Sequence, residues 1–523
     1  MTLLTSPTIL LTLTLLTLYI AYTKTKLYLT RRTFKSHHHC KPCPHTYHHD
    51  PILALDVLHE TLTAAKSRRL LKNFQARFAR MGGATTYRTR MLTQPFIVTC
   101  EPANIQTILS LRFKDYSLGN RIDSFHALLG DGIFNSDGAT WARSRALLRP
   151  SFARDRVSDL EGLEALVGTL VSLLPRDGAT VDLQGLFFRF TLDSAMAFLF
   201  GSAVGSLEGR EEAARFALAL GVASRDIVAK FRYGALKGVR PGKREAEAAV
   251  RTCHEYVERF VDEAIAWRKE REEKVADGDV DCGRHGGGEG EEKNGEKYVF
   301  LRELVKQTTD RTRLRDELIN VLLAGRDSTA ALMANFFFEV AKRPDIWEEL
   351  RREVGVLEGK VPSYEELRGF KLVKYCLNEI LRLYPVVPNN ARLAIRDTVL
   401  PLGGGTDSKS PLFVPAGTTI GYNPYVMHRN PTFYGPTAES FDPYRWATIR
   451  PGWEYLPFNG GPRICLGQQF ALTEASYVVV RMVQEFARVE SRDENGGVWV
   501  EELGLTLSSF GGAKVGLWGA ERG

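Results

Sequence analysis

A ten-residue segment near the C-terminus constrains this chain more than any other feature. It reads Phe458-Asn-Gly-Gly-Pro-Arg-Ile-Cys-Leu-Gly467 and has the form F-x-x-G-x-R-x-C-x-G. Its glycines permit a tight loop whose backbone amides point at one sulfur. Residues 467–486 have helical apolar spacing, so Cys465 lies just before a predicted helix start. Both features favour a thiolate at Cys465, whereas Cys376, in an apolar helical pattern, is predicted to be a buried structural cysteine.

This segment resembles the haem-binding loop of the cytochromes P-450, the haem-thiolate monooxygenases, and the resemblance extends over essentially the whole chain. It implies a mainly α fold with small β-sheets, haem b as the cofactor, and Cys465 as the axial ligand of the haem iron. Such a ligand pushes electron density toward bound dioxygen and promotes O–O cleavage. Within the loop, which begins at Phe458, Arg463 can reach a haem propionate as a charge-assisted donor.

Two arginine-containing motifs match other haem contacts of the family. Trp141-x-x-x-Arg145 resembles the motif of the family's C helix, and at i and i+4 both side chains share one helix face, where they can hold one propionate. The alternative for this pair is ordinary surface packing. Arg392, in the segment VVPNNARLA, matches the position from which many members give another propionate contact.

Residues 324–329, AGRDST, form a polar island inside a long apolar helical pattern. Gly325 is expected to leave room for dioxygen. The hydroxyl of Ser328 can bond to the carbonyl oxygen four residues earlier and open a groove for water, so that Asp327 and Ser328 deliver protons. The family usually has Thr at this position, and Thr329 is a candidate to share the role. The alternative is a broken helix, with Gly325 as its stop and Asp327 or Ser328 as the next N-cap.

A third motif is Glu379-x-x-Arg382, with Arg445 downstream in the segment FDPYRW. An isolated ion pair at i and i+3 is ordinarily a minor surface feature. In the family, this pair and the later arginine form a buried triad that fixes the core beside the haem. The motifs occur in the family's order, with 52 residues from Asp327 to Glu379 and 86 from Glu379 to Cys465.

The composition is that of a globular protein with few special constraints. The 523 residues carry 69 basic and 62 acidic side chains, a net charge of +7, with 44% hydrophobic residues. Lys and Arg are scattered among acids, which argues against nucleic-acid binding, and seven irregularly placed cysteines argue against a disulfide scaffold. Strands are expected in 85–99 and 393–427, and helices in 103–111, 157–174, 211–229, 244–271 and 312–342.

The N-terminal residues predict a membrane anchor, residues 1–24. Residues 2–23 carry no charge, and Lys24, Lys26, Arg31, Arg32 and Lys35 follow. A run of this length can cross a bilayer; a cleaved signal peptide is the alternative, but the positive n-region is missing. The basic residues should stay cytosolic, which gives a single-pass protein of the endoplasmic reticulum membrane with its catalytic domain facing the cytosol.

The remaining chain divides into a stalk, residues 25–60, and a catalytic domain, residues 61–523. The stalk contains HHHCKPCPHTYHH, residues 37–49, with Cys40 and Cys43. A zinc site is the alternative for this cluster, but its two prolines suggest an extended connection. An insert at about 275–297, including the Gly- and Glu-rich run Asp277–Lys297, has too little apolar content to pack and is predicted to be a disordered surface loop.

Because only 58 residues follow Cys465, no fused flavin domain is expected. The resemblance implies electrons from NADPH-cytochrome P-450 reductase, with cytochrome b5 as a possible helper. Basic residues around Trp141 lie where the family docks an acidic donor, namely Arg143, Arg145, Arg149 and Arg154. A solvated helix face is the alternative for these arginines.

The expected substrate is a lipophilic small molecule, hydroxylated with dioxygen. Residues 458–477 and the segment Leu400-Pro-Leu-Gly-Gly-Gly405 look like the fungal group that hydroxylates n-alkanes and fatty acids, often at the terminal carbon. Tailoring of a fungal secondary metabolite is the runner-up. A haem-thiolate isomerase that needs no electrons, or a membrane protein without catalysis, belongs to a different class. Such isomerases tend to lose the acid–alcohol pair that Asp327 and Ser328 retain.

Overall fold

The computed structural model describes residues 7–46, 48–50, 52–91, 94–153, 160–276 and 299–520. The chain divides into two compact units. One, called the sheet unit here, comprises Met1–Glu60, Phe74–Ser117 and Ala391–Tyr422. The other, called the helical unit, comprises Thr61–Asn73, Leu118–Asn390 and Asn423–Gly523. Apart from its first two residues, the predicted insert at 275–297 lies outside the described residues.

The two regions predicted to form strands contribute to a five-stranded sheet and to a separate hairpin. The order of the sheet is β1-β2-β8-β5-β3, where β2 and β8 are parallel and β1 and β2 are antiparallel. The hairpin is antiparallel and joins β6 and β7. The bounds are β1 Thr86–Met91, β2 Gln94–Thr99, β3 Tyr116–Ser117, β5 Asn390–Ala394, β6 Thr398–Gly404, β7 Ser410–Val414 and β8 Thr419–Tyr422.

The predicted strand region 393–427 ends earlier than expected. Residues Pro424–Met427 form the short helix α17 instead. The side chain of Asn423 caps it by accepting the backbone N–H of Val426 at 2.8 Å. A proline at the first helical position has no N–H to satisfy, so this sequence starts a helix rather than extending the strand.

The sheet unit also holds the helices of the N-terminal part of the chain. They are α1 Pro7–His37, α4 Pro102–Gln106, the π-helix η1 Thr107–Leu111 and the 3-10 turn η2 Phe113–Asp115. The predicted helix 103–111 therefore exists, but its second half is wound as a π-helix. Helices α2 Leu55–Lys66 and α3 Leu70–Arg80 belong partly to each unit.

Helix α1 includes most of the uncharged N-terminal run. Its large apolar side chains are exposed, among them Leu10, Leu16 and Tyr22. None of the helices among the described residues combines the length and the hydropathy needed to cross a bilayer. The predicted transmembrane helix is therefore not confirmed.

The segment after α1, predicted as an extended stalk, lies along the strands of the sheet unit. Three backbone hydrogen bonds attach it, from Lys41 N–H to Pro411, from Gly405 N–H to Pro42 and from Arg88 N–H to Pro44. The thiols of Cys40 and Cys43 donate to the backbone carbonyls of His38 and Thr86. A Cβ added at Gly404 would lie 2.8 Å from the Lys41 carbonyl oxygen, so this glycine lets the segment approach β6.

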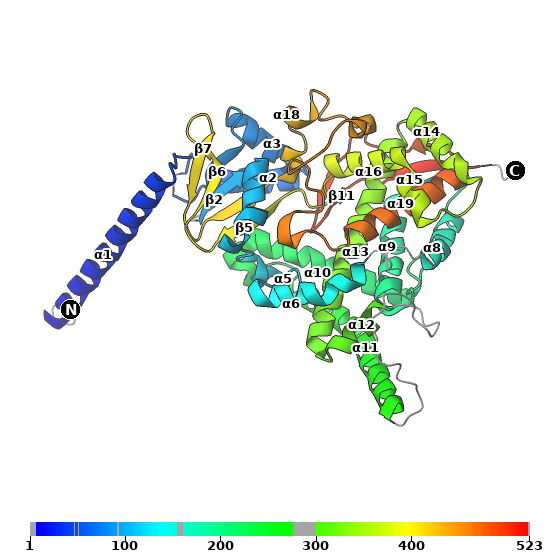
Figure 1. Ribbon diagram of the computed structural model, residues 1–523, viewed down its shortest axis with the longest axis horizontal. Helices are drawn as coiled ribbons and strands as arrows, with labels where there is room; N and C mark the ends of the chain where they lie inside the picture. Colours follow the sequence, from blue (N-terminus) through cyan, green and yellow to red (C-terminus); the bar gives the residue numbers. More distant parts are fainter. Residues whose placement is uncertain are drawn as a thin grey trace, which may run out of the picture. The chain divides into compact units, whose positions relative to one another are not determined.

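The helical unit contains most of the helices of the chain (Figure 1). Its α-helices are α5 Arg121–Leu129, α6 Gly138–Leu148, α8 Glu161–Ser172, α9 Leu183–Phe200, α10 Glu211–Tyr233, α11 Lys243–Ala276, α12 Phe300–Gln307, α13 Arg311–Val340, α14 Pro344–Val354, α15 Tyr364–Gly369, α16 Lys371–Leu383, α17, α18 Pro431–Tyr434 and α19 Gln468–Glu485. Its 3-10 turns are η3 Arg149–Phe152, η4 Gly234–Val239, η5 Gly355–Leu357, η6 Pro443–Ala447 and η7 Gly461–Arg463.

Two small sheets complete this unit. The many helices and the small sheets together confirm the predicted mainly α architecture. Strand β12 lies between β4 and β9 in an antiparallel three-stranded sheet, and β10 pairs with β11. The strands are β4 Asp177–Asp182, β9 Phe486–Ser491, β10 Glu501–Leu503, β11 Leu507–Ser509 and β12 Lys514–Gly519. The predicted helices 211–229, 244–271 and 312–342 correspond to α10, α11 and α13, and 157–174 contains α8, although 157–159 lie outside the described part.

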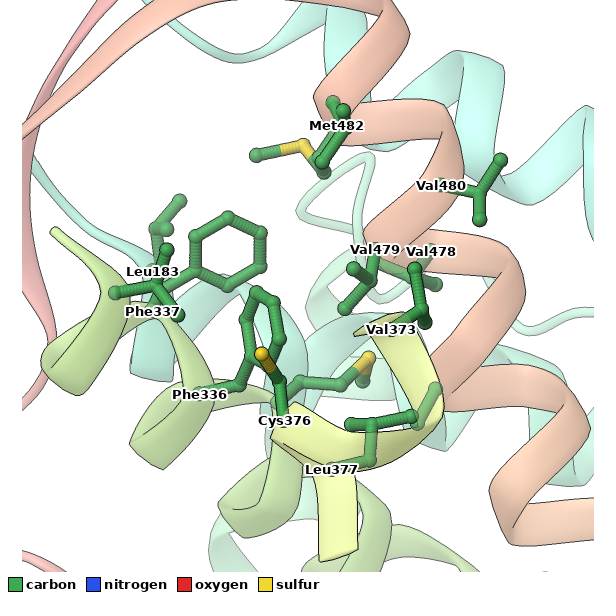
Figure 2. Close-up of a cluster of buried hydrophobic side chains, with 14 of the residues drawn as sticks. Leu183, Phe336, Phe337, Val373, Cys376, Leu377, Val478, Val479, Val480 and Met482 are labelled. Atoms are coloured by element: carbon green, nitrogen blue, oxygen red, sulfur yellow. The ribbon is translucent and has the colours of Figure 1, made fainter. Parts of the chain in front are cut away.

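The core of the helical unit is assembled around α13, which packs against α9, α16 and α19. Figure 2 shows Phe336 and Phe337 of α13 beside Cys376 of α16 and Val479 of α19. Cys376 is fully buried, as predicted, and burial raises the pKa of its thiol. Each such apolar side chain contributes on the order of 1.5–3 kcal/mol by leaving water, so this junction fixes the helices that carry the candidate site.

Candidate functional site

The cysteine loop is closed by its own backbone. Cys465 N–H donates to the carbonyl of Phe458 at 3.0 Å, and Ile464 N–H donates to Gly461 at 3.0 Å. Gly461 has a φ of +66°, which favours glycine. A Cβ added at Gly460 would lie 2.6 Å from the Trp453 ring. Gly460 is therefore needed for close packing, whereas Gly461 is needed for its backbone conformation. Helix α19 begins three residues after the cysteine, as the sequence predicts.

Cys465 differs from the other described cysteines. Its side chain is exposed, whereas Cys40 and Cys43 are half-buried and Cys100, Cys253 and Cys376 are buried. Even so, surrounding protein atoms desolvate the sulfur and raise the pKa of Cys465, against the lowering effects of a hydrogen bond from Gly467 N–H and of the Arg145 charge. The Gly467 N–H and the Arg145 charge both act in the direction that a thiolate needs, and the thiolate at Cys465 stays a prediction.

Helix α6 presents Trp141 and Arg145 to this loop. Arg145 donates to the carbonyl of Ile464 at 2.9 Å, one residue before the cysteine. Trp141 contacts the loop through Arg463, whose guanidinium carbon lies 4.4 Å from the centre of the Trp141 ring. The structure thus brings Trp141, Arg145 and Arg463 together around Cys465.

Arg463 has protein partners that the sequence did not indicate. Its Nη2 donates to Asp137 Oδ1 at 2.7 Å and to the Ser136 carbonyl at 2.9 Å. The propionate contact expected for Arg463 would therefore share this guanidinium with a carboxylate. Arg392, the other arginine expected at a propionate, belongs to β5 and the sheet unit, where its guanidinium carbon lies 5.8 Å from the Tyr422 ring centre.

Helix α13 runs without a break through the polar island, so the broken-helix alternative is wrong. Ser328 Oγ donates to the Ala324 carbonyl at 2.6 Å, which is the hydrogen bond predicted from the spacing. A Cβ added at Gly325 would contact the Ala195 Cβ at 3.7 Å. A side chain at Gly325 would thus meet α9 at an ordinary contact distance, and the expectation that this glycine leaves room for dioxygen stays a prediction.

Two desolvated carboxyl groups, half-buried Asp327 and buried Glu474, flank the hydroxyls of α13. Burial raises the pKa of Asp327, against the charge of Arg326, whose Nη1 lies 3.1 Å from Asp327 Oδ1. Glu474, on α19, hydrogen bonds with Ser194 and with Thr329, and burial raises its pKa to about 7. Sequence reasoning missed Glu474, although a glutamate inside the apolar segment FALTEASYVVV is a signal that could have found it.

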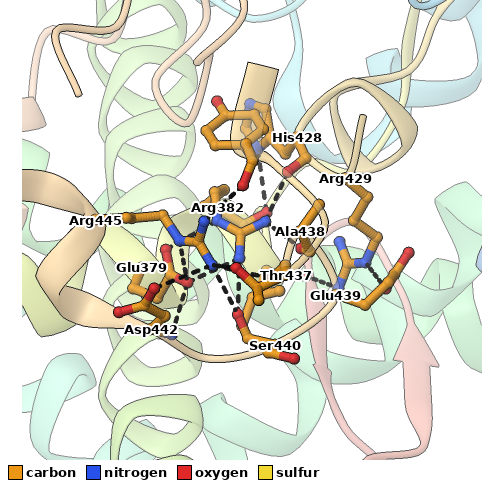
Figure 3. Close-up of polar contacts among 12 residues, drawn as sticks. Glu379, Arg382, His428, Arg429, Thr437, Ala438, Glu439, Ser440, Asp442 and Arg445 are labelled. Atoms are coloured by element: carbon orange, nitrogen blue, oxygen red, sulfur yellow. Dashed lines mark hydrogen bonds and ion pairs between the residues drawn. The ribbon is translucent and has the colours of Figure 1, made fainter. Parts of the chain in front are cut away.

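The predicted triad is present and fully enclosed (Figure 3). Arg382 binds both oxygens of Glu379 at 2.8 Å, and Arg445 Nε binds Glu379 Oε1 at 3.0 Å. The remaining guanidinium donors bind backbone carbonyls of the segment before the cysteine loop, at His428, Tyr434, Thr437, Ala438 and Ser440. Breaking such a buried network typically costs about 3–5 kcal/mol, so this segment is tied to α16.

Comparison with known proteins identifies the family. The sequence model of the family described as Cytochrome P-450 matches residues 56–497. The chain is 46% identical over 484 residues to the cytochrome P-450 monooxygenase himC of Aspergillus japonicus, covering 92% of this chain and 84% of the relative. It is 44% identical over 501 residues to the cytochrome P-450 monooxygenase fsdH of Fusarium heterosporum, with 95% and 86% covered.

A third relative is cytochrome P-450 52A3-A of Candida maltosa, 41% identical over 468 residues, with 85% of each chain covered. This chain belongs to the cytochrome P-450 family and is a P-450 monooxygenase, whose cofactor is haem b. The site fits that cofactor, because the exposed thiol is held by a backbone amide beside two arginines. A metal cation at the sulfur would offset the desolvation that raises the thiol pKa.

His428 is a buried neutral histidine next to the triad. Its Nε2 accepts the Leu456 N–H at 2.8 Å, so its Nδ1 carries the proton and donates to the Arg382 carbonyl at 3.2 Å. Burial, followed by the charge of Arg382, lowers its pKa to about 3.

We therefore expect His428 to weaken the fold in acid. Below the ordinary histidine pKa of about 6.5, His428 binds a proton in the unfolded chain, whereas in the folded chain it stays neutral until about pH 3. The free energy of unfolding should fall by up to about 1.4 kcal/mol per pH unit in this window. Urea unfolding followed by circular dichroism at pH 7, 6 and 5 measures the slope. His428→Gln should flatten it and the exposed-site control His126→Gln should not; equal slopes in all three proteins contradict the prediction.

Proposed function

We propose that this monooxygenase hydroxylates a long aliphatic chain, an n-alkane or a fatty acid, at or near its terminal carbon. The observation that carries the proposal is the likeness of residues 458–477 to the fungal group with that activity. The segment 400–405 supports it less, because its glycines have a packing reason: a Cβ at Gly403 would lie 2.8 Å from Thr86, and Gly404 approaches Lys41.

Tailoring of a fungal secondary metabolite is the second candidate. The relatives himC and fsdH are more similar to this chain than cytochrome P-450 52A3-A is. Their names do not place them among the cytochromes P-450 52, and this similarity therefore favours the second candidate. An electron-independent isomerase is disfavoured because the acid–alcohol pair is intact, with the Ser328 hydroxyl bonded within α13 beside the half-buried Asp327.

A titration of the purified holoenzyme separates these substrate classes. We expect n-alkanes and long-chain fatty acids to shift the haem absorption spectrum by displacing water from the iron, with saturation at micromolar concentration. Polycyclic compounds of similar hydrophobicity serve as the matched control. A shift with the polycyclic compounds alone contradicts the aliphatic proposal.

A second assay separates a monooxygenase from an isomerase. With NADPH and reductase added, a monooxygenase consumes NADPH and oxygen in step with product, whereas an isomerase consumes neither.

The haem, when bound, supplies an iron centre that binds and reduces dioxygen. We propose that Cys465 ligates the iron, that Phe458 and Arg463 shape the loop behind the sulfur, and that Trp141, Arg145 and Arg392 hold the propionates. What supports this role for Cys465 is the exposed thiol in a loop closed by backbone hydrogen bonds.

Cys465→Ala should abolish the thiolate signature of the reduced carbon-monoxide complex, because no other described cysteine is exposed. Cys376→Ala is the matched control: it leaves a small cavity in the core and lowers stability by on the order of 1 kcal/mol, but it should keep the signature. Absorption spectra of both variants decide the matter. Retention of the signature in Cys465→Ala would remove the basis of the ligand assignment.

For proton delivery we propose Asp327 and Ser328, with Thr329 in a supporting position. The Ser328 hydroxyl bonds to Ala324 within α13, whereas the Thr329 hydroxyl bonds to Glu474. The two hydroxyls therefore serve different partners, and only the first belongs to the predicted groove.

Ser328→Ala should raise the share of NADPH that ends as peroxide several-fold without changing the affinity for substrate, and Asp327→Asn should slow product formation. Thr329→Val removes the supporting hydroxyl and a partner of the buried Glu474 carboxyl group. It should lower stability by about 1–3 kcal/mol and raise the peroxide share less than Ser328→Ala does. Peroxide, NADPH and product are measured together. If Thr329→Val uncouples the enzyme and Ser328→Ala does not, the hydroxyl assignment is wrong.

We further propose that residues 2–23 attach the protein to the endoplasmic reticulum membrane and that an NADPH-dependent reductase, aided by cytochrome b5, docks at the basic face of α6. The exposed Arg143 and Arg149 support the docking surface, and Arg154 lies outside the described residues. The uncharged run followed by five basic residues supports the attachment.

Deletion of residues 2–23 should move the protein from the membrane pellet to the supernatant while its haem spectrum is unchanged. A variant that replaces Lys24 and Lys26 by Gln is the control, since it keeps the apolar run and should stay in the pellet. Fractionation with immunodetection reads both. A mature chain that begins near residue 24 would establish a cleaved signal peptide instead.

A further inference from the structure

The segment 130–137, between α5 and α6, is held along α13 by three polar side chains. Asp316, Glu317 and Asn320 accept backbone N–H groups of this segment, from Asp131 at 3.1 Å, Ile133 at 3.1 Å and Phe134 at 2.9 Å. Buried side-chain acceptors that satisfy successive backbone donors fix the course of a loop. The segment therefore has a rigid support on α13.

Two glycines make this close approach possible. Gly130 has a φ of +50°, and a Cβ added there would overlap the Asp316 carboxylate. A Cβ added at Gly132 would lie 2.3 Å from the Asn320 side-chain nitrogen. Neither position tolerates a larger residue without moving the loop, so the segment is placed accurately at its start.

At its other end the segment delivers Asp137 to the cysteine loop. Asp137 Oδ1 accepts from Arg463 Nη2 at 2.7 Å, and Asp137 Oδ2 accepts the Leu118 N–H at 2.9 Å. The Arg463 side chain is 9% exposed and that of Asp137 is 29% exposed, so this charge-assisted bond is shielded from water mainly on the arginine side. Both carboxylate oxygens are used, which fixes the orientation of the group.

Arg463 is held from a second side as well. Its guanidinium lies over Trp141 of α6 and donates to the Ser136 carbonyl. Arg145, one turn beyond Trp141, donates to the carbonyl of Ile464. Two guanidinium groups therefore meet the residues just before Cys465, and Asp137 supplies a carboxylate to one of them.

We propose that Asp137 is a positioning residue for the haem-thiolate centre. It orients Arg463, and through it the loop of Cys465, and its negative charge offsets one of the two arginine charges beside the sulfur. Removing the charge should loosen Arg463, which keeps its contacts with Ser136 and Trp141, and should make the surroundings of the iron more positive. The reduced iron, which carries one positive charge fewer, is then favoured. This inference rests on the proposed ligation by Cys465.

The test uses purified holoenzyme of Asp137→Asn, with Asp131→Asn as the matched control. Asp131 lies in the same segment, but its side chain is 72% exposed. We expect a more positive reduction potential in Asp137→Asn and a roughly tenfold faster loss of the thiolate signature of the reduced carbon-monoxide complex on warming, the factor that corresponds to losing one charge-assisted hydrogen bond. Asp131→Asn should match the wild type in both.

Asp137→Glu provides a second variant in case the amide variant does not fold. It keeps the charge but displaces the carboxylate, so the potential should stay near that of the wild type while the thiolate signature is lost faster. Values for both Asp137 variants equal to those of Asp131→Asn overturn the proposal. A wild-type protein without the thiolate signature would instead refute the ligation by Cys465, which is a different outcome from any change confined to the Asp137 variants.

Discussion

The carboxylate of Glu379 is the point on which the haem-side half of the helical unit depends. It is fully buried and accepts five N–H donors, two from Arg382 and one each from Arg445, Asp442 and Trp446. The Glu379 carboxylate thus meets two positive charges, Asp442 Oδ2 lies 3.7 Å from Arg445 Nη2, and the remaining guanidinium donors bind backbone carbonyls of residues 428–440. A buried charge of this kind persists only where every donor has a partner, so the irregular segment before the cysteine loop has one permitted course.

That course determines the environment of His428 and, beyond it, the start of the cysteine loop. The Arg382 guanidinium donates to the His428 carbonyl, and the Arg382 carbonyl accepts the ring N–H of His428. Two hydrogen bonds therefore join these residues, which lie 46 positions apart. The ring then receives Leu456 N–H, two residues before the loop begins. The triad, the neutral histidine and the loop form one continuous series of hydrogen bonds, in which a charge on the ring would oppose the nearby arginines.

The sequence predicted those parts of the site whose partners are close along the chain or belong to a family motif. The loop around Cys465, the Ser328 bond within α13 and the pairing of Glu379 with Arg382 are of this kind. The Asp137–Arg463 pair joins residues 326 positions apart, and no local pattern indicates it. Gly325 shows a related limit: a glycine in a helix indicates a close approach, but only the packing of α9 identifies Ala195 as a neighbour.

The unbroken course of α13 also changes how proton delivery at this site has to be understood. The backbone of α13 is continuous through residues 324–329, so the proposed proton delivery has to use the polar side chains of this segment and not a break in the helix. Half-buried Asp327 and buried Glu474 both have raised pKa values, and that of Glu474, at about 7, is close to neutral pH. A group exchanges protons most readily when its pKa lies near the ambient pH. Desolvation therefore places the pKa of Glu474 in the range where a carboxyl group can both take up and release a proton near neutral pH, and it moves the pKa of Asp327 in the same direction.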